Sequence, residues 1–93
     1  MNYVVKIEMN EGCDYSLNCQ DIKNLLIDLD GTGFKKYSKD YVYDYITKYP
    51  KSIAVNVAPY PILIPLVSKN GEKFVKSSPT NYSADNLLKL PRI

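Results

Sequence analysis

The alternation of apolar and polar residues predicts three strands in the first third of the chain. Residues 3–9 alternate toward their end, which is typical of a half-buried strand. Residues 22–29 are almost entirely apolar and predict a centrally placed strand, whereas the polar residues 10–19 predict a long turn. Asp30-Gly31 is a hairpin signal, because glycine readily adopts the positive φ of such turns. The chain is therefore expected to return through a third strand at residues 34–37.

A helix is expected next, because the period of the apolar residues changes. Ser38 is a suitable N-cap, since its hydroxyl accepts a hydrogen bond from a free amide of the first turn. Pro50 should end the helix, because proline disfavours helical geometry in the residue before it. The apolar positions in between form one wide stripe, which we interpret as core packing: Tyr41, Val42, Tyr45, Ile46 and Tyr49.

The second half of the chain predicts three more strands and a short helix. Residues 52–57 and 62–68 have strand patterns, and Pro65 confines the second of these to a sheet edge or a bulge. Asn70-Gly71 predicts a hairpin that returns through residues 72–77. A final helix is expected at residues 84–89, with Ser83 as its cap.

This order predicts a single α+β domain spanning residues 1–93. We expect a mostly antiparallel sheet of five to six strands, packed with one central helix and a short C-terminal helix. The length of 93 residues suits one domain, and 45% apolar with 24% charged residues is ordinary globular composition. No apolar run approaches the ~20 residues that span a bilayer, and no signal peptide is evident. We therefore expect a soluble, cytoplasmic protein with no membrane partner.

Charge is distributed unevenly along the chain, although the net charge is only +2. Residues 1–30 contain two lysines and six acidic residues, a net charge of −4, whereas residues 31–93 contain ten basic and four acidic residues, a net charge of +6. Such polarity can orient one subunit against another in a homo-oligomer, or attract an anionic ligand. Lysines scattered over a solvated surface are the simpler interpretation.

Metal and redox chemistry have few candidate residues. The sequence contains no histidine, and its cysteines are Cys13 and Cys19. Two thiols cannot supply the four ligands of a structural zinc site, and they lack C-x-x-C spacing. We expect both thiols to be reduced, and no cofactor is expected.

The letters D-L-D-G-T at residues 28–32 raise the question of phosphatase chemistry. They resemble the first motif of haloacid-dehalogenase-type phosphatases, in which the first aspartate is the nucleophile. Such an enzyme also needs a late acidic pair to complete its magnesium site, and no such pair follows Asp30. A strand that ends in a tight turn explains the same letters. We therefore expect a turn, and a protein that is not an enzyme.

The C-terminal segment carries the most distinctive pattern. It ends in D-N-L-L-K-L-P at residues 85–91, after a strand with the pattern aromatic-x-Lys-Ser at residues 74–77. This pattern resembles a small bacterial and phage family, domain of unknown function 3892, in which arginine is common at the position of Lys76. The other matching parts are residues 4–7, Asp30-Gly31, the helix after Ser38 and residues 55–57.

The resemblance directs attention to a candidate ligand site near the C-terminus. Positive charge would come from Lys76 and Arg92, and a stacking surface for a base from Phe74 or Tyr82. Polar groups would come from Ser77 and Asn86. The alternative is that this segment is structural, with its leucines covering one end of the sheet.

Three functions remain open from the sequence. Some phage proteins of similar appearance sequester cyclic nucleotide signals of bacterial immune systems without degrading them, which would suit a chain with no evident catalytic group. A second possibility is a module that binds a host protein and inhibits a defence complex such as a CRISPR effector, through the edge around Pro65 and a tyrosine-rich surface. The third is an accessory domain that only dimerises.

Overall fold

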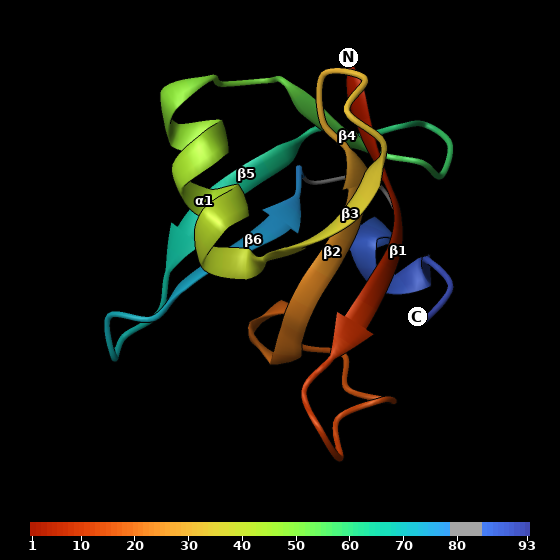
Figure 1. Ribbon diagram of the computed structural model, residues 1–93. Helices are drawn as coiled ribbons and strands as arrows, with labels where there is room; N and C mark the ends of the chain where they lie inside the picture. The colour runs from red at the N-terminus through yellow and green to blue at the C-terminus, as the bar shows by residue number, and fades with distance from the viewer. Residues whose placement is uncertain (79–84) are drawn as a thin grey trace.

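The computed structural model describes residues 1–78 and 85–93 and shows the α+β fold that the sequence predicts (Figure 1). The elements occur in the expected order: β1 Asn2–Met9, β2 Ile22–Asp28, β3 Phe34–Ser38, α1 Lys39–Lys48, β4 Ile53–Val55, β5 Leu63–Val67 and β6 Lys73–Ser77, with 3₁₀ turns at Cys19–Asp21 and Asn86–Lys89. No helix in this part of the chain has the length and apolar character needed to cross a bilayer.

The described strands form two sheets, whereas the sequence suggests one. Four strands pair in the order β3-β2-β1-β4, and β5 pairs separately with β6. The β1–β2, β2–β3 and β5–β6 pairs are antiparallel, but β1 pairs with β4 in parallel, with Asn2 opposite Ile53. The predicted single sheet of five to six mostly antiparallel strands is thus correct in class and in most pairings. It is wrong in the number of sheets, because β4 pairs with a strand distant in sequence.

The β5–β6 hairpin has the turn that the sequence predicts. Gly71 has a φ of 82°, and the hydroxyl of Ser68 accepts hydrogen bonds from the amides of Asn70 and Glu72. Pro65 lies opposite Val75 in a two-stranded sheet, where β5 is an edge strand that tolerates a residue without an N–H donor. Residue Ile62 bridges to Ala54, so β5 begins next to β4.

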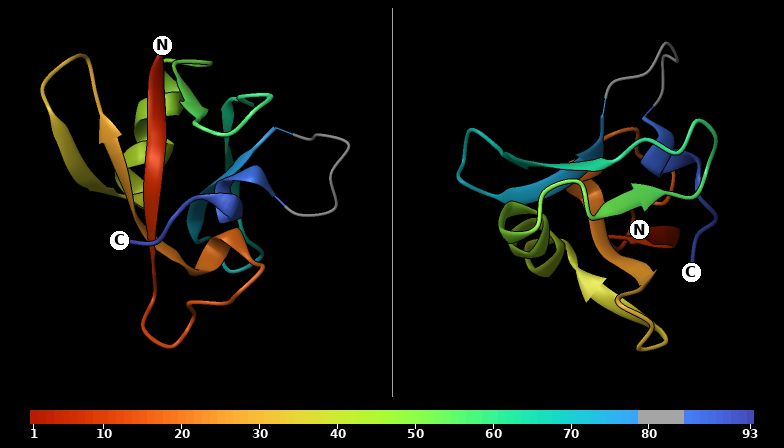
Figure 2. Two further views of the ribbon diagram at one scale, coloured as in Figure 1. Left: turned by 90° about the vertical axis from the view of Figure 1, so that its right-hand side faces the viewer. Right: turned by 90° about the horizontal axis from the view of Figure 1, so that it is seen from above.

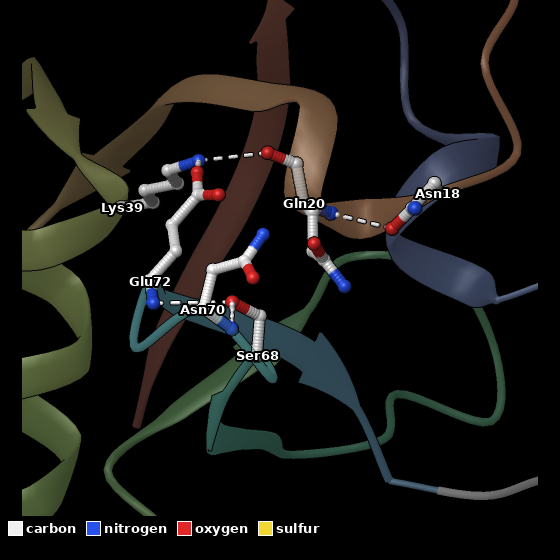
Figure 3. Close-up of polar contacts among 6 residues, drawn as sticks. All are labelled: Asn18, Gln20, Lys39, Ser68, Asn70 and Glu72. Carbon is white, nitrogen blue, oxygen red and sulfur yellow. Dashed lines mark hydrogen bonds and ion pairs between the residues drawn. The ribbon is translucent and has the colours of Figure 1, made fainter.

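A lysine fastens this hairpin to the first turn of α1 (Figure 3). The Nζ atom of Lys39 donates to the backbone oxygen of Gln20, 2.7 Å away, and forms an ion pair with Glu72. The Lys39 side chain is only 14% exposed, whereas its partner Glu72 is 46% exposed, so the ammonium group is the shielded side of this ion pair. The 3₁₀ turn at Gln20 and the hairpin tip are consequently held against the same end of the helix.

Helix α1 begins and ends close to the predicted limits, but two of its tyrosines are not core residues. Ser38 caps the helix by accepting from the amide of Tyr41, 3.1 Å away. Of the predicted stripe, Val42 and Ile46 are buried, whereas Tyr41 and Tyr49 are 51% and 48% exposed. The interpretation of the stripe as core is therefore correct for Val42, Ile46 and the half-buried Tyr45, which packs against the core, and wrong for Tyr41 and Tyr49. Figures 1 and 2 show the helix beside the β5–β6 hairpin, and the two buried residues pack into the core between them and the larger sheet.

The C-terminal helix is shorter than predicted and has a different cap. The described residues form a four-residue 3₁₀ turn, Asn86–Lys89, capped by Asp85; Ser83 and Ala84 lie outside the described residues. The chain then runs beside β1, where the Ile7 amide donates to the oxygen of Pro91 at 3.1 Å and the Ile93 amide donates to the oxygen of Ile7 at 2.9 Å. The last residues thereby extend the sheet where β4 stops.

The core lies between the four-stranded sheet, the hairpin, helix α1 and the C-terminal turn. Helix α1 and all described strands except β3 contribute buried apolar side chains to it. The fully buried side chains of largest volume are Ile7, Ile22, Leu25, Ile27, Ile46, Ile53, Leu63, Leu87, Val4, Val42, Val55 and Val75.

Candidate functional site

The predicted site residues near the C-terminus are largely engaged in holding the chain together. Ser77 is 3% exposed, and both its amide and its hydroxyl donate to Oδ1 of Asp85, at 3.2 and 2.8 Å. The same oxygen accepts from the amide of Leu87, 2.9 Å away. Asn86 is completely buried beside this contact. Asp85, which we did not include among the site residues, therefore connects β6 to the 3₁₀ turn.

Arg92 also has structural partners. Its Nη1 atom donates to the backbone oxygens of Leu88 and Leu90, at 3.0 and 2.8 Å. Its Nε atom reaches the oxygen of Asp14 at 3.4 Å. The guanidinium group thus satisfies carbonyls at the end of the 3₁₀ turn through its Nη1 atom.

The other predicted site residues, Phe74, Lys76 and Tyr82, do not join Ser77 and Asn86. Phe74 and Lys76 alternate with Val75 and Ser77 along β6, so they lie on the opposite face of that strand. Phe74 is half-buried and packs against the core. Tyr82 lies outside the described residues. The structure therefore brings Ser77 and Asn86 together but does not bring Phe74 and Lys76 to their side.

The D-L-D-G-T letters form the turn between β2 and β3. Oδ1 of Asp28 accepts from the amide of Gly33 at 2.9 Å, and the hydroxyl of Thr32 donates to the oxygen of Leu29 at 2.8 Å. Asp30 has a φ of 54°, a left-handed conformation that aspartate tolerates better than most residues. Within the described residues no group of three or more Cys, Asp or Glu side chains is placed to hold a metal ion.

A groove lies between this turn and helix α1, and we take it as the candidate site. It has a volume of about 950 Å³. It is lined by Met1, Asn2, Asp30, Tyr41, Asp44, Tyr45, Lys48, Tyr49, Lys51 and Ser52. Three of these are the tyrosines at successive turns of α1, so one helix supplies an aromatic wall and the β2–β3 turn supplies the opposite rim. We call this feature the tyrosine groove.

Hydrogen bonds fix the rim of the tyrosine groove. The amide of Asp30 donates to Oδ1 of Asn2 at 3.1 Å, which ties the turn to the start of β1. The hydroxyl of Tyr45 donates to Oδ2 of Asp30, also at 3.1 Å. Burial, followed by this hydrogen bond to the carboxylate, raises the pKa of Tyr45 above its ordinary value. The middle tyrosine is thus a neutral strut between helix and turn. The half-exposed rings are those of Tyr41, which stacks on Tyr37, and Tyr49, which tilts against Tyr45.

The charged residues that line the groove have different surroundings. Nζ of Lys48 lies 5.4 Å from the ring centre of Tyr49, in cation–π range. Asp44 forms an ion pair with Lys73 at 3.0 Å, so its charge is offset from outside the groove. Lys51 also lines the groove and has a φ of 62°. The groove therefore combines stacking surfaces with two lysines, and of its two carboxylates one is paired and the other is hydrogen-bonded.

The cysteines take no part in this groove. Cys19 is buried, and burial raises the pKa of its thiol to about 12. A thiol with this pKa stays protonated near neutral pH and is a poor nucleophile. Both cysteines are free thiols, as expected from the sequence.

The hydrophobic pattern does not reveal the groove, because it counts the tyrosines as apolar residues. A signal was nevertheless present: three of the five stripe positions are tyrosine rather than Leu, Ile or Val. Tyrosine has an apolar ring and a polar tip, and it is often found where one side of a residue is wet. A stripe with this composition indicates a face at the boundary of the core.

Comparisons with known proteins add no relative: no family model, no curated protein and no solved structure matches this chain. The functional argument therefore depends on the residues of the chain and their geometry.

Proposed function

We propose that the protein is a non-enzymatic binding module and that its tyrosine groove holds a nucleotide. The observation that carries this proposal is the gathering of three tyrosines and two lysines around one groove of about 950 Å³. Pockets for small ligands and cofactors typically measure ~300–1,000 Å³, so the groove has room for a nucleotide of one or two bases.

Each part of such a ligand has a counterpart in the groove. A base can stack on the half-exposed rings of Tyr41 or Tyr49, and such stacking contributes about 1–3 kcal/mol per base. Phosphates can be bound by Lys48 and Lys51. Lys48 already lies over the ring of Tyr49, so it would have to turn from the ring toward the phosphate when a base takes its place.

The biological role we propose is sequestration in the cytoplasm. A protein that binds a cyclic nucleotide immune signal without cleaving it would act as an anti-defence factor of phage or bacterial origin. The support for this role is the resemblance of residues 74–91 to the family named above, together with the absence of an evident catalytic constellation in the sequence. In this view the C-terminal residues hold the fold and the tyrosine groove holds the ligand.

The test is a thermal-shift screen with cyclic ADP-ribose isomers and cyclic oligonucleotides, followed by chromatography of the recovered ligand. A ligand present at about 100 times its Kd stabilises the native state by about 2.7 kcal/mol, which a melting curve resolves. We expect a shift and an intact ligand. We expect Tyr49→Ala or Lys48→Ala to weaken binding by about tenfold, because each removes a stacking or a phosphate contact.

The C-terminal residues supply the matched controls. Phe74→Ala and Lys76→Ala remove an aromatic ring and a cation of the same kinds from outside the groove, and we expect them to leave the Kd unchanged. If binding is lost with these variants and kept with the groove variants, the ligand site is at the C-terminus. No shift with any ligand of the screen would contradict nucleotide binding.

A second candidate function is binding of a host protein, and a continuous exposed aromatic surface favours it. Beyond Met1 and Asn2 the tyrosine groove adjoins a hollow of about 290 Å³ that also contains Tyr3 and Phe34. Phe34 is 59% exposed, and the ring of Tyr60, 54% exposed, packs edge-on against Tyr3. Exposed aromatic residues are enriched at protein interfaces. Purification from host lysate should separate the candidates, because an inhibitor retains a protein whereas a sequestering module retains a nucleotide detectable by mass spectrometry.

A further inference from the structure

The loop between β1 and β2 presents two large apolar side chains to solvent. Tyr15 is 97% exposed and Leu17 is 84% exposed, more than any other large hydrophobic residue in the described part of the chain. Two antiparallel strands can be joined by two residues, whereas residues 10–21 separate β1 from β2 here. Of these, Cys19–Asp21 form a 3₁₀ turn, and residues 10–18 project as an irregular loop. We call Tyr15 and Leu17 with their loop the apolar knob.

Internal hydrogen bonds hold the knob in place. The amide of Cys13 donates to the oxygen of Asn10, and the amide of Ser16 donates to the oxygen of Cys13, at 2.9 and 3.0 Å. The Ser16 hydroxyl donates to the carboxylate of Asp21 and accepts from the amide of Asn18. The loop is thus a preformed surface, and its ordering cost on binding is small.

The knob and the tyrosine groove lie at opposite ends of the molecule. In Figure 1 and in the left view of Figure 2, the loop is at the bottom, whereas the chain start and the β2–β3 turn that border the groove are at the top. The knob of one molecule therefore cannot enter its own groove. A second copy of the protein can bring its knob to this groove.

The charges of the two features are complementary. Residues 10–21 contain Glu11, Asp14 and Asp21 and no basic residue. The groove contributes Lys48 and Lys51; of its two carboxylates, Asp44 is paired with Lys73 and Asp30 accepts a hydrogen bond from Tyr45. An acidic loop with an aromatic tip thus matches a groove with aromatic walls and lysines at its rim.

We propose that the knob of one copy docks into the tyrosine groove of the next. Tyr15 would pack on the rings of Tyr41 and Tyr49, with the loop carboxylates near Lys48 and Lys51. Such a head-to-tail contact uses two different surfaces, so it produces chains or rings rather than a two-fold dimer. The inference shares its site with the proposed function, and it follows that a nucleotide in the groove competes with assembly.

Complementary variants test this contact. Tyr15→Ser with Leu17→Ser removes the knob, and Lys48→Glu with Tyr49→Ser removes the groove; unchanged circular dichroism shows that each variant folds. We expect the weight-average mass of the wild-type protein to rise above the 10.6 kDa of one chain with concentration, measured by sedimentation. Each variant alone should stay at one chain. An equimolar mixture should form a pair and stop there, because only one functional interface remains.

Salt adds a second measurement, because the loop and lysine charges are exposed and screened at high ionic strength. We expect wild-type association to weaken as salt is raised. A wild-type mass that stays at one chain at all concentrations would overturn the inference, as would variants that still associate alone or a mixture that forms no pair.

Thermal shifts with nucleotides test the proposed function separately when they are measured on the knob variant, whose groove is intact. A thermal shift without wild-type assembly refutes only the knob contact. Assembly without a thermal shift refutes only nucleotide binding.

Discussion

At the scale of single residues, the choice between tyrosine and aliphatic side chains divides helix α1 into two faces. Val42 and Ile46 lie four residues apart on one row of the helix and are buried. Tyr41 and Tyr49 lie on the neighbouring row and remain half-exposed. A burial pattern counted only as apolar or polar treats these residues alike. Their difference is chemical: a phenol can keep its hydroxyl in water or give it to a carboxylate, as Tyr45 does with Asp30.

Tyr45→Phe should remove the strut across the groove. The hydrogen bond to Asp30 is partly exposed, so we expect the free energy of unfolding to fall by about 0.5–1.5 kcal/mol at neutral pH. The raised pKa of Tyr45 stabilises the fold at pH values below about 10, where an unfolded tyrosine is still protonated, and this contribution is lost as the pH rises through the folded pKa. The difference between wild type and variant, measured by urea unfolding, should therefore shrink in alkaline solution.

Tyr15→Phe is the matched control, because it removes the same hydroxyl from a residue that is 97% exposed. We expect no measurable change in stability at either pH. A difference between wild type and Tyr45→Phe that grows with pH would contradict the assignment of the hydrogen bond.

At the scale of elements, short capping contacts decide where the chain turns. Asp85 is the example: one carboxylate oxygen accepts from Ser77 twice and from the amide of Leu87. Asp85→Ala should lower the free energy of unfolding by about 2–3 kcal/mol, because it removes an N-cap and leaves a buried serine hydroxyl without this acceptor. Asp85→Asn keeps one oxygen and should lose less than half as much. Equal losses in the two variants, measured by chemical denaturation, would show that charge rather than the acceptor matters.

The lysine that joins α1 to the hairpin gives a second prediction at this scale. Lys39→Met removes a 14%-exposed ammonium group and its bonds to Gln20 and Glu72, and we expect a loss of about 1 kcal/mol. Lys36→Met removes a lysine that is 51% exposed and 3.7 Å from Glu8, and we expect a loss below about 0.5 kcal/mol. Hydrogen exchange should also quicken at the amide of Glu72 only in the first variant. A greater effect of Lys36→Met would refute this ranking.

Local signals explain which elements could be predicted. Strand limits, the Ser38 cap, the Asn70-Gly71 turn and the edge position of Pro65 each depend on residues close together in sequence. The C-terminal turn was predicted with the wrong cap because Ser83 and Asp85 are both suitable residue types, and only the contact with Ser77 on β6 favours Asp85. The tyrosines of the helix stripe indicate one wall of the groove, but its opposite rim could not be predicted, since that rim comes from a separate part of the chain.

At the scale of the whole molecule, pairing between distant segments decides the architecture. The parallel contact between β1 and β4 and the alignment of Ile7 with Arg92 join residues that no local pattern relates. Both contacts lie along the same side of β1, first β4 and then the C-terminal residues. Of the pattern D-N-L-L-K-L-P, Pro91 thus reaches this sheet edge, whereas Leu87, Leu88 and Leu90 are buried in the core. This arrangement favours a structural role for the segment over a ligand site.

Removal of residues 91–93 tests that role. The Ile7 amide would lose its acceptor, the oxygen of Pro91 at 3.1 Å, and the carbonyls of Leu88 and Leu90 would lose the Arg92 guanidinium. We expect the Ile7 amide to exchange with solvent at least tenfold faster, measured by NMR, because an exposed edge amide is no longer protected by a hydrogen bond. The amide of Leu25 on β2, which pairs with Tyr37 on β3, should keep its protection because that antiparallel pair is unaltered. Uniform loss at both amides would mean that the segment supports global stability rather than this edge, whereas no change at Ile7 would refute the pairing itself.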